Sequence, residues 1–80
     1  MKAIKTRSLD LHGLRVPEAL ALVDELINQA VMNNIEQVEV VHGIGRGKIK
    51  QALHAHLMKL KVVKRYTLDD SNPGVTKIYL

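Results

Sequence analysis

The hydrophobic and polar residues of this chain follow two different periods, and the changes of period divide it into short segments. Four segments alternate in polarity or are rich in β-branched and aromatic side chains, and turn-forming residues flank them, which predicts β-strands. They are residues 6–11 (TRSLDL), 37–41 (QVEVV), 62–68 (VVKRYTL) and 75–80 (VTKIYL).

Two further segments, residues 17–33 and 48–60, follow the helical period of three and four residues. Pro17 suits the first turn of the first helix, and Asn33–Asn34 is a plausible stop. The first stripe consists of Val16, Ala19, Leu20, Val23, Leu26, Ile27, Ala30 and Val31. The second consists of Ile49, Ala52, Leu53, Leu57 and Leu60.

The predicted order is therefore β-α-β-α-β-β, in which the turn formers of residues 69–74 (DDSNPG) join the last two strands. Two strand–helix–strand units followed by a hairpin predict an α/β fold with a mixed four-stranded sheet and two helices packed on it. We expect one domain over residues 8–80, with residues 1–7 forming a tail and the start of the first strand.

Charge is distributed unevenly over the 80 residues, whose formal net charge is +4. The first half has a balance of −2 and the second half of +6, which favours an anionic partner, most simply nucleic acid. A solvated basic surface is the alternative. Tyr66 and Tyr79 are the only aromatic residues, which argues against a surface that binds single strands by stacking.

Residue types and segments that the sequence lacks exclude further classes of site and of protein. The chain has no cysteine, which excludes disulfides and thiolate metal sites. No apolar run approaches the roughly 20 residues of a membrane span, and MKAIKTRS is not followed by the apolar core of a signal peptide. We therefore expect a cytoplasmic location and no membrane partner.

The first candidate for chemistry is LDLHG at residues 9–13. Strand alternation would place Asp10 and His12 on one face, near the end of the strand, and His42 ends the second strand in the same manner. This set suits general acid–base catalysis or one divalent metal ion. In the alternative interpretation, Asp10 caps the following loop and His12 makes a hydrogen bond in the turn.

The second candidate is HGIGRGKIK at residues 42–50, which opens the second helix. Glycines permit close approach by a ligand, and a helix N-terminus and cations favour an anion. The spacing of the glycines fits neither the Walker loop nor the dinucleotide fingerprint. We therefore expect the bound phosphate to belong to a nucleic-acid backbone. A turn that needs glycine only for its shape is the alternative. The predicted phosphate-binding residues are Gly43, Gly45, Arg46, Gly47, Lys48 and Lys50.

Two further histidines and four further cations lie on and after the second helix. Spacing places His56 beside the apolar stripe and His54 off it, and we expect both to be surface or flanking residues rather than ligands. Four cations further along extend a phosphate-contacting surface or are simply solvated. They are Lys59, Lys61, Lys64 and Arg65.

LDLHG, HGIGRG and GVTKIYL together resemble the Smr domain, the small MutS-related module, over about residues 8–80. The resemblance implies a fold similar to the C-terminal domain of the third bacterial translation initiation factor. It also implies nuclease activity that nicks DNA or cuts RNA. Many members end a MutS-like ATPase, and some act on ribosomes or in ribosome rescue.

By position, Asp10 and His12 match the acidic and histidine positions of the first family motif. His42, Gly43, Gly45 and Gly47 match the second motif, in which Lys48 is an unusual addition. The resemblance implies that Asp10, His12 and His42 are catalytic. Members with arginine in place of His12 are of doubtful competence, and this chain has the histidine.

Three functions follow as hypotheses. The first is an endonuclease domain, part of a larger MutS-like ATPase, with an Asp/His pair and a phosphate-binding loop. The second is a non-catalytic module that binds DNA or the ribosome, and the third is a protein-interaction domain. The sequence leaves open DNA or RNA as substrate, the use of one divalent metal ion, and the oligomeric state.

Overall fold

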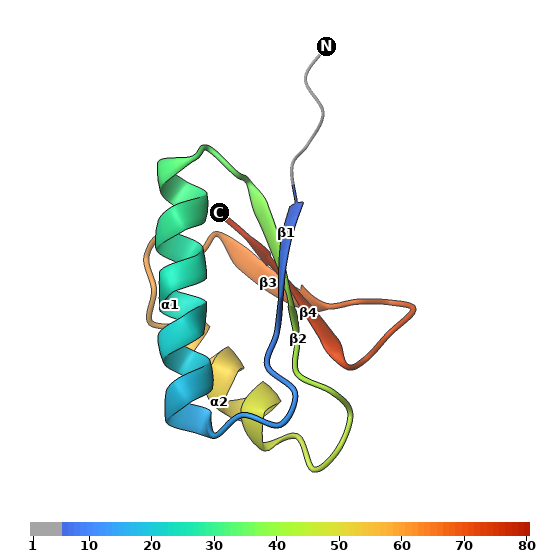
Figure 1. Ribbon diagram of the computed structural model, residues 1–80. Helices are drawn as coiled ribbons and strands as arrows, with labels where there is room; N and C mark the ends of the chain where they lie inside the picture. The colour runs from blue at the N-terminus through green and yellow to red at the C-terminus, as the bar shows by residue number, and fades with distance from the viewer. Residues whose placement is uncertain (1–5) are drawn as a thin grey trace.

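The computed structural model describes residues 6–80, so most of the predicted tail of residues 1–7 lies outside the described residues (Figure 1). The predicted order β-α-β-α-β-β is confirmed. The elements are β1 (Thr6–Asp10), α1 (Val16–Met32), β2 (Gln37–Val41), α2 (Lys48–Leu57), β3 (Arg65–Leu68) and β4 (Val75–Tyr79).

The strands form one mixed sheet in the order β1-β2-β4-β3. Strands β1 and β2 are parallel, while β4 is antiparallel to both of its neighbours. The connections β1-α1-β2 and β2-α2-β3 therefore both join parallel strands, and both move across the sheet in the same direction. Since such crossovers are right-handed, both helices lie on one face of the sheet, as Figure 1 shows.

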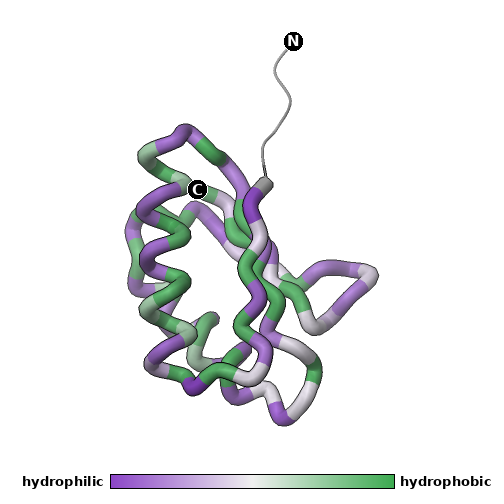
Figure 2. The backbone as a smooth tube through the Cα atoms, in the orientation of Figure 1, coloured by the Kyte–Doolittle hydropathy of each residue, from purple (hydrophilic) through white to green (hydrophobic). Residues whose placement is uncertain are grey.

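The buried residues lie between the two layers. Hydrophobic and hydrophilic residues therefore alternate along the strands and helices, as Figure 2 shows. One face of each strand is covered by the helices, while the opposite face carries exposed residues such as Ser8, Asp10 and Thr67. The core consists of Leu11, Ala19, Val23, Ile27, Ala30, Ile35, Val38, Val40, Leu53, Leu57 and Ile78. Most of both predicted apolar stripes belongs to this core or packs against it.

Helix α1 begins and ends as its sequence predicts. The Glu18 carboxylate accepts a hydrogen bond from the Arg15 backbone N–H (3.2 Å), and Pro17 occupies the first turn. After the helix, Asn34 adopts a left-handed conformation (φ 58°), which asparagine tolerates better than most residues. The Asn33–Asn34 stop is thus confirmed.

The segment between α2 and β3 differs from the prediction. Helix α2 ends at Leu57 rather than at residue 60, and β3 begins at Arg65 rather than at residue 62. Turns occupy the gap, in which the N–H of Leu60 donates to the Leu57 carbonyl and the N–H of Val63 donates to the Leu60 carbonyl. Leu60 and Val63 still pack against the core, so their apolar character indicates burial and not regular structure.

Candidate functional site

Residues 10–13, here named the DLHG turn, connect β1 to the two residues that precede α1. One carboxylate oxygen of Asp10 accepts a hydrogen bond from the His12 backbone N–H (2.8 Å). The Leu14 N–H donates to the Leu11 carbonyl (3.1 Å), and Gly13 has φ +80°. Asp10 therefore caps the loop, as the alternative interpretation holds, and the His12 side chain is exposed.

The three predicted catalytic residues do not meet as one cluster. Strand β1 ends at Asp10, so strand alternation does not extend to His12. Asp10 lies on the open face of the sheet, whereas His42 continues the buried side of β2, after Val38 and Val40. Within residues 6–80, no three His, Asp or Glu side chains lie close enough together to hold a metal ion.

Residues 43–47, here named the glycine loop, leave β2 and enter α2. The loop is anchored to the start of β4, because the Gly74 carbonyl accepts hydrogen bonds from the N–H groups of both His42 (2.9 Å) and Gly43 (3.0 Å). A Cβ atom on Gly74 would lie 3.2 Å from the Cα and carbonyl carbon of Gly43. This close backbone approach leaves little room for a side chain at position 74.

The glycine loop and the first turn of α2 present free donors. In the described part of the chain, no internal acceptor is found for the backbone N–H groups of residues 44–50. The first turn of α2 contains no acidic residue, and Arg46 and Lys48 are exposed beside it. Unpaired amides at a helix N-terminus with adjacent cations are typical of a site for phosphate or another anion.

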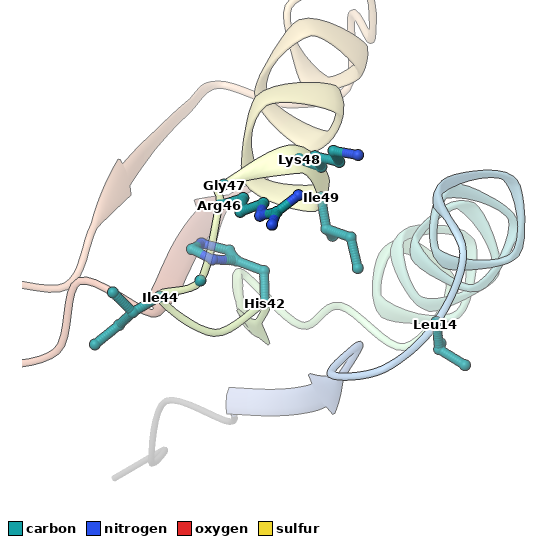
Figure 3. Close-up of a pocket in the computed structure, with 8 residues that line it drawn as sticks. Leu14, His42, Ile44, Arg46, Gly47, Lys48 and Ile49 are labelled. Atoms are coloured by element: carbon teal, nitrogen blue, oxygen red, sulfur yellow. The ribbon is translucent and has the colours of Figure 1, made fainter.

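Two surface hollows meet at the glycine loop. One, of about 260 Å³, is lined by Arg46, Lys48 and the loop backbone, and Figure 3 shows these side chains around His42. The other, of about 360 Å³, contains His12. His42, Ile44 and Gly45 line both, and the Ile44 side chain, 70% exposed, points away from the other labelled side chains in Figure 3.

The DLHG turn and the glycine loop are in contact. A Cβ atom added to Gly43 would lie 3.6 Å from Cδ2 of His12, so the His12 ring lies against the first residue of the loop. The hollow beside it joins residues from the end of β1, the end of β2 and the 69–74 turn. The structure thus brings the two sequence motifs together, with the His12 ring against Gly43 and His42 lining the same hollow.

His42 lies in a buried polar network that the sequence did not predict. Its side chain is 7% exposed, and its Nε2 lies 2.8 Å from the hydroxyl of Thr76, which is fully buried. The Nε2 of His54 lies 2.8 Å from the same hydroxyl. The sequence did not predict these contacts of His54, which is half-buried and whose ring turns toward β4 and packs beside Tyr66 (centroids 4.8 Å apart).

Burial lowers the pKa of His54 below its ordinary value of 6.5. Repulsion from His42 and from Lys50 contributes in the same direction. Desolvation favours the neutral imidazole. His54 is thus held in the form that has one N–H donor to offer Thr76.

The remaining predicted residues lie away from the glycine loop. His56 Nε2 forms a hydrogen bond with the Asp24 carboxylate of α1 (2.7 Å), which joins the two helices. Lys59, Lys61, Lys64 and Arg65 follow the C-terminal end of α2, and Arg65 pairs with Tyr79 at the end of the sheet opposite to the loop. These four cations do not extend the surface formed by Arg46 and Lys48.

We predict that the backbone of the glycine loop, and not its side-chain space, limits substitution at Gly47. Gly47 has φ +75°, and the nearest atom to an added Cβ is the flexible end of Lys50 at 3.8 Å. Gly47→Ala should therefore destabilise the domain by about 1–2 kcal/mol, the cost of a left-handed L-residue. Gly45→Ala is the matched control, since its φ is not in that region and nothing lies within 4 Å. Urea unfolding measures both, and equal effects would contradict the prediction.

We also predict a pH-dependent stability that comes from His54. Because its folded pKa is lowered, the unfolded chain takes up the proton first, and the unfolding free energy falls as the pH drops below 6.5. The groups facing the ring are His42, Lys50, Tyr66 and Thr76. His54→Gln retains a donor to Thr76 without titrating, so it should weaken this dependence. Urea unfolding at about pH 7.5 and about pH 5 measures it, and an unchanged slope would refute it.

Comparison with known proteins identifies a family that covers almost the whole chain. The model of the Smr domain family matches residues 9–80. "Endonuclease MutS2" of Streptococcus gordonii is 42% identical over 66 residues, which are 82% of this chain and 8% of that protein. The protein of the same name from Streptococcus mutans shows the same identity and coverage. The chain thus spans about one twelfth of the length of these relatives.

Solved structures agree with the fold. The Smr domain of Thermus thermophilus MutS2 superposes with a TM-score of 0.89 at 31% identity, covering 92% of this chain and 96% of that one. YdaL, a stand-alone small MutS-related protein from Escherichia coli, has a TM-score of 0.87 at 24% identity, covering 95% and 67%. The first structure is similar to this chain in both sequence and fold, and the second shows similarity of fold alone. With the family match over almost its whole length, this chain belongs to the Smr domain family.

Proposed function

We propose that this domain binds the phosphodiester backbone of a nucleic acid at the glycine loop and cleaves it with His12. The observation that carries the proposal is the contact between the His12 ring and Gly43, which sets an exposed imidazole beside a loop of free amides. Relatives that are named endonucleases support cleavage as the activity. DNA and RNA are both candidate substrates.

The phosphate would bind to the N–H groups of residues 44–50, with Arg46 and Lys48 beside it. These donors are positioned before the substrate arrives, because Gly74 anchors one end of the loop and α2 fixes the other. Preorganised donors stabilise the negative charge that develops on the phosphate oxygens as the nucleophile attacks. The loop would therefore contribute to both affinity and rate.

His12 is the group best placed to transfer a proton. Its ring is exposed next to the loop, and histidine changes its charge near neutral pH. In the proposed reaction, His12 accepts the proton of the attacking hydroxyl or water, the new P–O bond forms, and the bond to the leaving oxygen breaks. Asp10 holds the backbone of His12 and adds a negative charge close to the turn.

A divalent metal ion, left open by the sequence, has few protein ligands in this arrangement. One oxygen of Asp10 is engaged by the His12 backbone, and His42 faces the covered side of the sheet. The described residues do not assemble three ligands at one point. The mechanism above therefore assigns no step to a metal, and a chelator belongs in its test.

The alternative function is binding without cleavage. The hydrogen bond from the His12 backbone to Asp10 favours it, because a loop cap explains the aspartate without chemistry. In that case the loop would dock the domain on DNA or on ribosomal RNA, with steep salt dependence. In either case we propose that the domain is part of a longer MutS-like ATPase, because the residues that match make up only 8% of the relative's length.

We predict that His12→Ala strongly slows cleavage and leaves binding intact. The purified chain is incubated with supercoiled plasmid and with a structured RNA, with and without a chelator. Loss of a proton-transfer group should slow cleavage by about 10²- to 10⁴-fold, while oligonucleotide affinity stays within about twofold. Asp10→Asn keeps the oxygen that caps the turn and removes the charge, so it separates the two roles of Asp10.

His56→Ala is the matched control, since it removes a histidine that pairs with Asp24 away from the loop. It should cleave at the rate of the natural sequence. If the natural sequence binds both substrates without cutting either, the binding module replaces the nuclease. If His12→Ala cuts as fast as the natural sequence, His12 has no catalytic role.

A further inference from the structure

Three polar side chains from distant segments converge between α2 and the sheet. His42 follows β2, His54 lies on α2 and Thr76 lies on β4, at the centre of the group. Both ring Nε2 atoms lie 2.8 Å from the Thr76 hydroxyl, and His42 Nδ1 lies 2.9 Å from the Gly43 carbonyl oxygen. The proposed reaction uses neither His54 nor Thr76, so the reason for this buried group requires a separate explanation.

The chemistry of the partners fixes the direction of each hydrogen bond when His42 is neutral. A carbonyl oxygen only accepts, so the proton of His42 is on Nδ1 and its Nε2 is an acceptor. The single hydrogen of the Thr76 hydroxyl must then point to His42 Nε2. The Thr76 oxygen in turn accepts the N–H of His54 Nε2. The chain runs in one direction, from His54 through Thr76 to His42 and Gly43.

This chain ends on the peptide group that opens the phosphate-binding loop. The bond from His42 directs the Gly43 carbonyl toward the buried ring. No peptide bond among the described residues is cis, so the Ile44 N–H of the same peptide unit points to the opposite side. Ile44 provides the first of the free amides in the loop. The orientation of that donor thus depends on the state of His42.

We propose that His54 and Thr76 are positioning residues, which hold His42 in its Nδ1–H form and thereby orient the Gly43–Ile44 peptide for phosphate. The proposal rests on the proposed phosphate site and adds residues that touch no substrate. It also gives His42 a role that fits its burial, since both of its ring nitrogens are occupied within the protein. Removing the Thr76 hydroxyl should release the ring and disorder the peptide.

The test uses Thr76→Val, which keeps the shape of the side chain and removes the hydroxyl, and Thr76→Ser, which restores it. The first measurement is the ¹⁵N NMR spectrum of the His42 ring, which reports which nitrogen holds the proton. The second is the affinity for a short single-stranded oligonucleotide. Thr67→Val is the matched control, since Thr67 is exposed on β3 and bonds only to its neighbour's carbonyl.

We expect the natural chain and Thr76→Ser to show a protonated Nδ1 and a bare Nε2 on His42. Thr76→Val should mix the two forms, shift the amide signals of residues 43–47 and weaken oligonucleotide binding about three- to tenfold, the value of one hydrogen bond. His54→Leu, which removes the donor to Thr76, should act in the same direction and more weakly. It also serves if Thr76→Val does not fold.

A His42 ring protonated on Nε2 in the natural chain would overturn the proposal. So would a Thr76→Val variant that folds and binds with the affinity of Thr76→Ser. If the natural chain binds no oligonucleotide, the proposed function fails, but the ring spectrum and the loop signals still decide whether the network orients the peptide. The two failures are therefore distinguishable.

Discussion

The arrangement of the site depends on one close backbone contact, between Gly74 at the start of β4 and Gly43 at the end of β2. A single carbonyl, that of Gly74, accepts the N–H groups of His42 and Gly43, and a Cβ atom on Gly74 would be in tight contact with Gly43. This contact fixes where the glycine loop leaves the sheet. The position of the loop beside His12, and the direction from which it enters α2, both follow from it.

The site is assembled from segments that are distant in sequence and adjacent in the sheet. The order β1-β2-β4-β3 sets the end of β1 beside the end of β2, and the end of β2 beside the start of β4. The DLHG turn, the glycine loop and Gly74 therefore meet at one edge. Ordinary backbone pairing creates this meeting point, and the helix dipole of α2 and the two exposed cations give it a preference for anions.

The sequence predicts the parts of the molecule whose signal is periodic or local. Apolar residues such as Val23 and Leu53 recur at helical spacing and are buried as expected. The turn formers of residues 69–74 and the stop at Asn34 act through their own backbone, so their effect is readable without tertiary information. The predicted end of the second helix and the predicted start of the third strand were wrong because of Leu60 and Val63. Both are apolar and pack against the core, but they lie in an irregular segment.

The candidate site was predictable in its motifs but not in its contacts. Asp10 and His42 look equivalent at the ends of two strands, yet they lie on opposite faces, because Asp10 pairs with Val41 and His42 is one residue further along. The contacts of His54 were not predictable, because its partner, Thr76, lies 22 residues away in sequence. One signal was available, since Thr76 shares a strand face with the buried Ile78, and a buried threonine needs a hydrogen-bonding partner.

The proposed function requires that the DLHG turn and the glycine loop form one binding site for a nucleic-acid phosphate. The most direct test is an NMR titration of the ¹⁵N-labelled chain with a short oligonucleotide at low salt. If they form one site, the NMR signals of the amides of residues 43–50 and of the His12 ring shift together, with one dissociation constant. Shifts confined to the Lys59–Arg65 segment, with the loop and His12 unchanged, would contradict it.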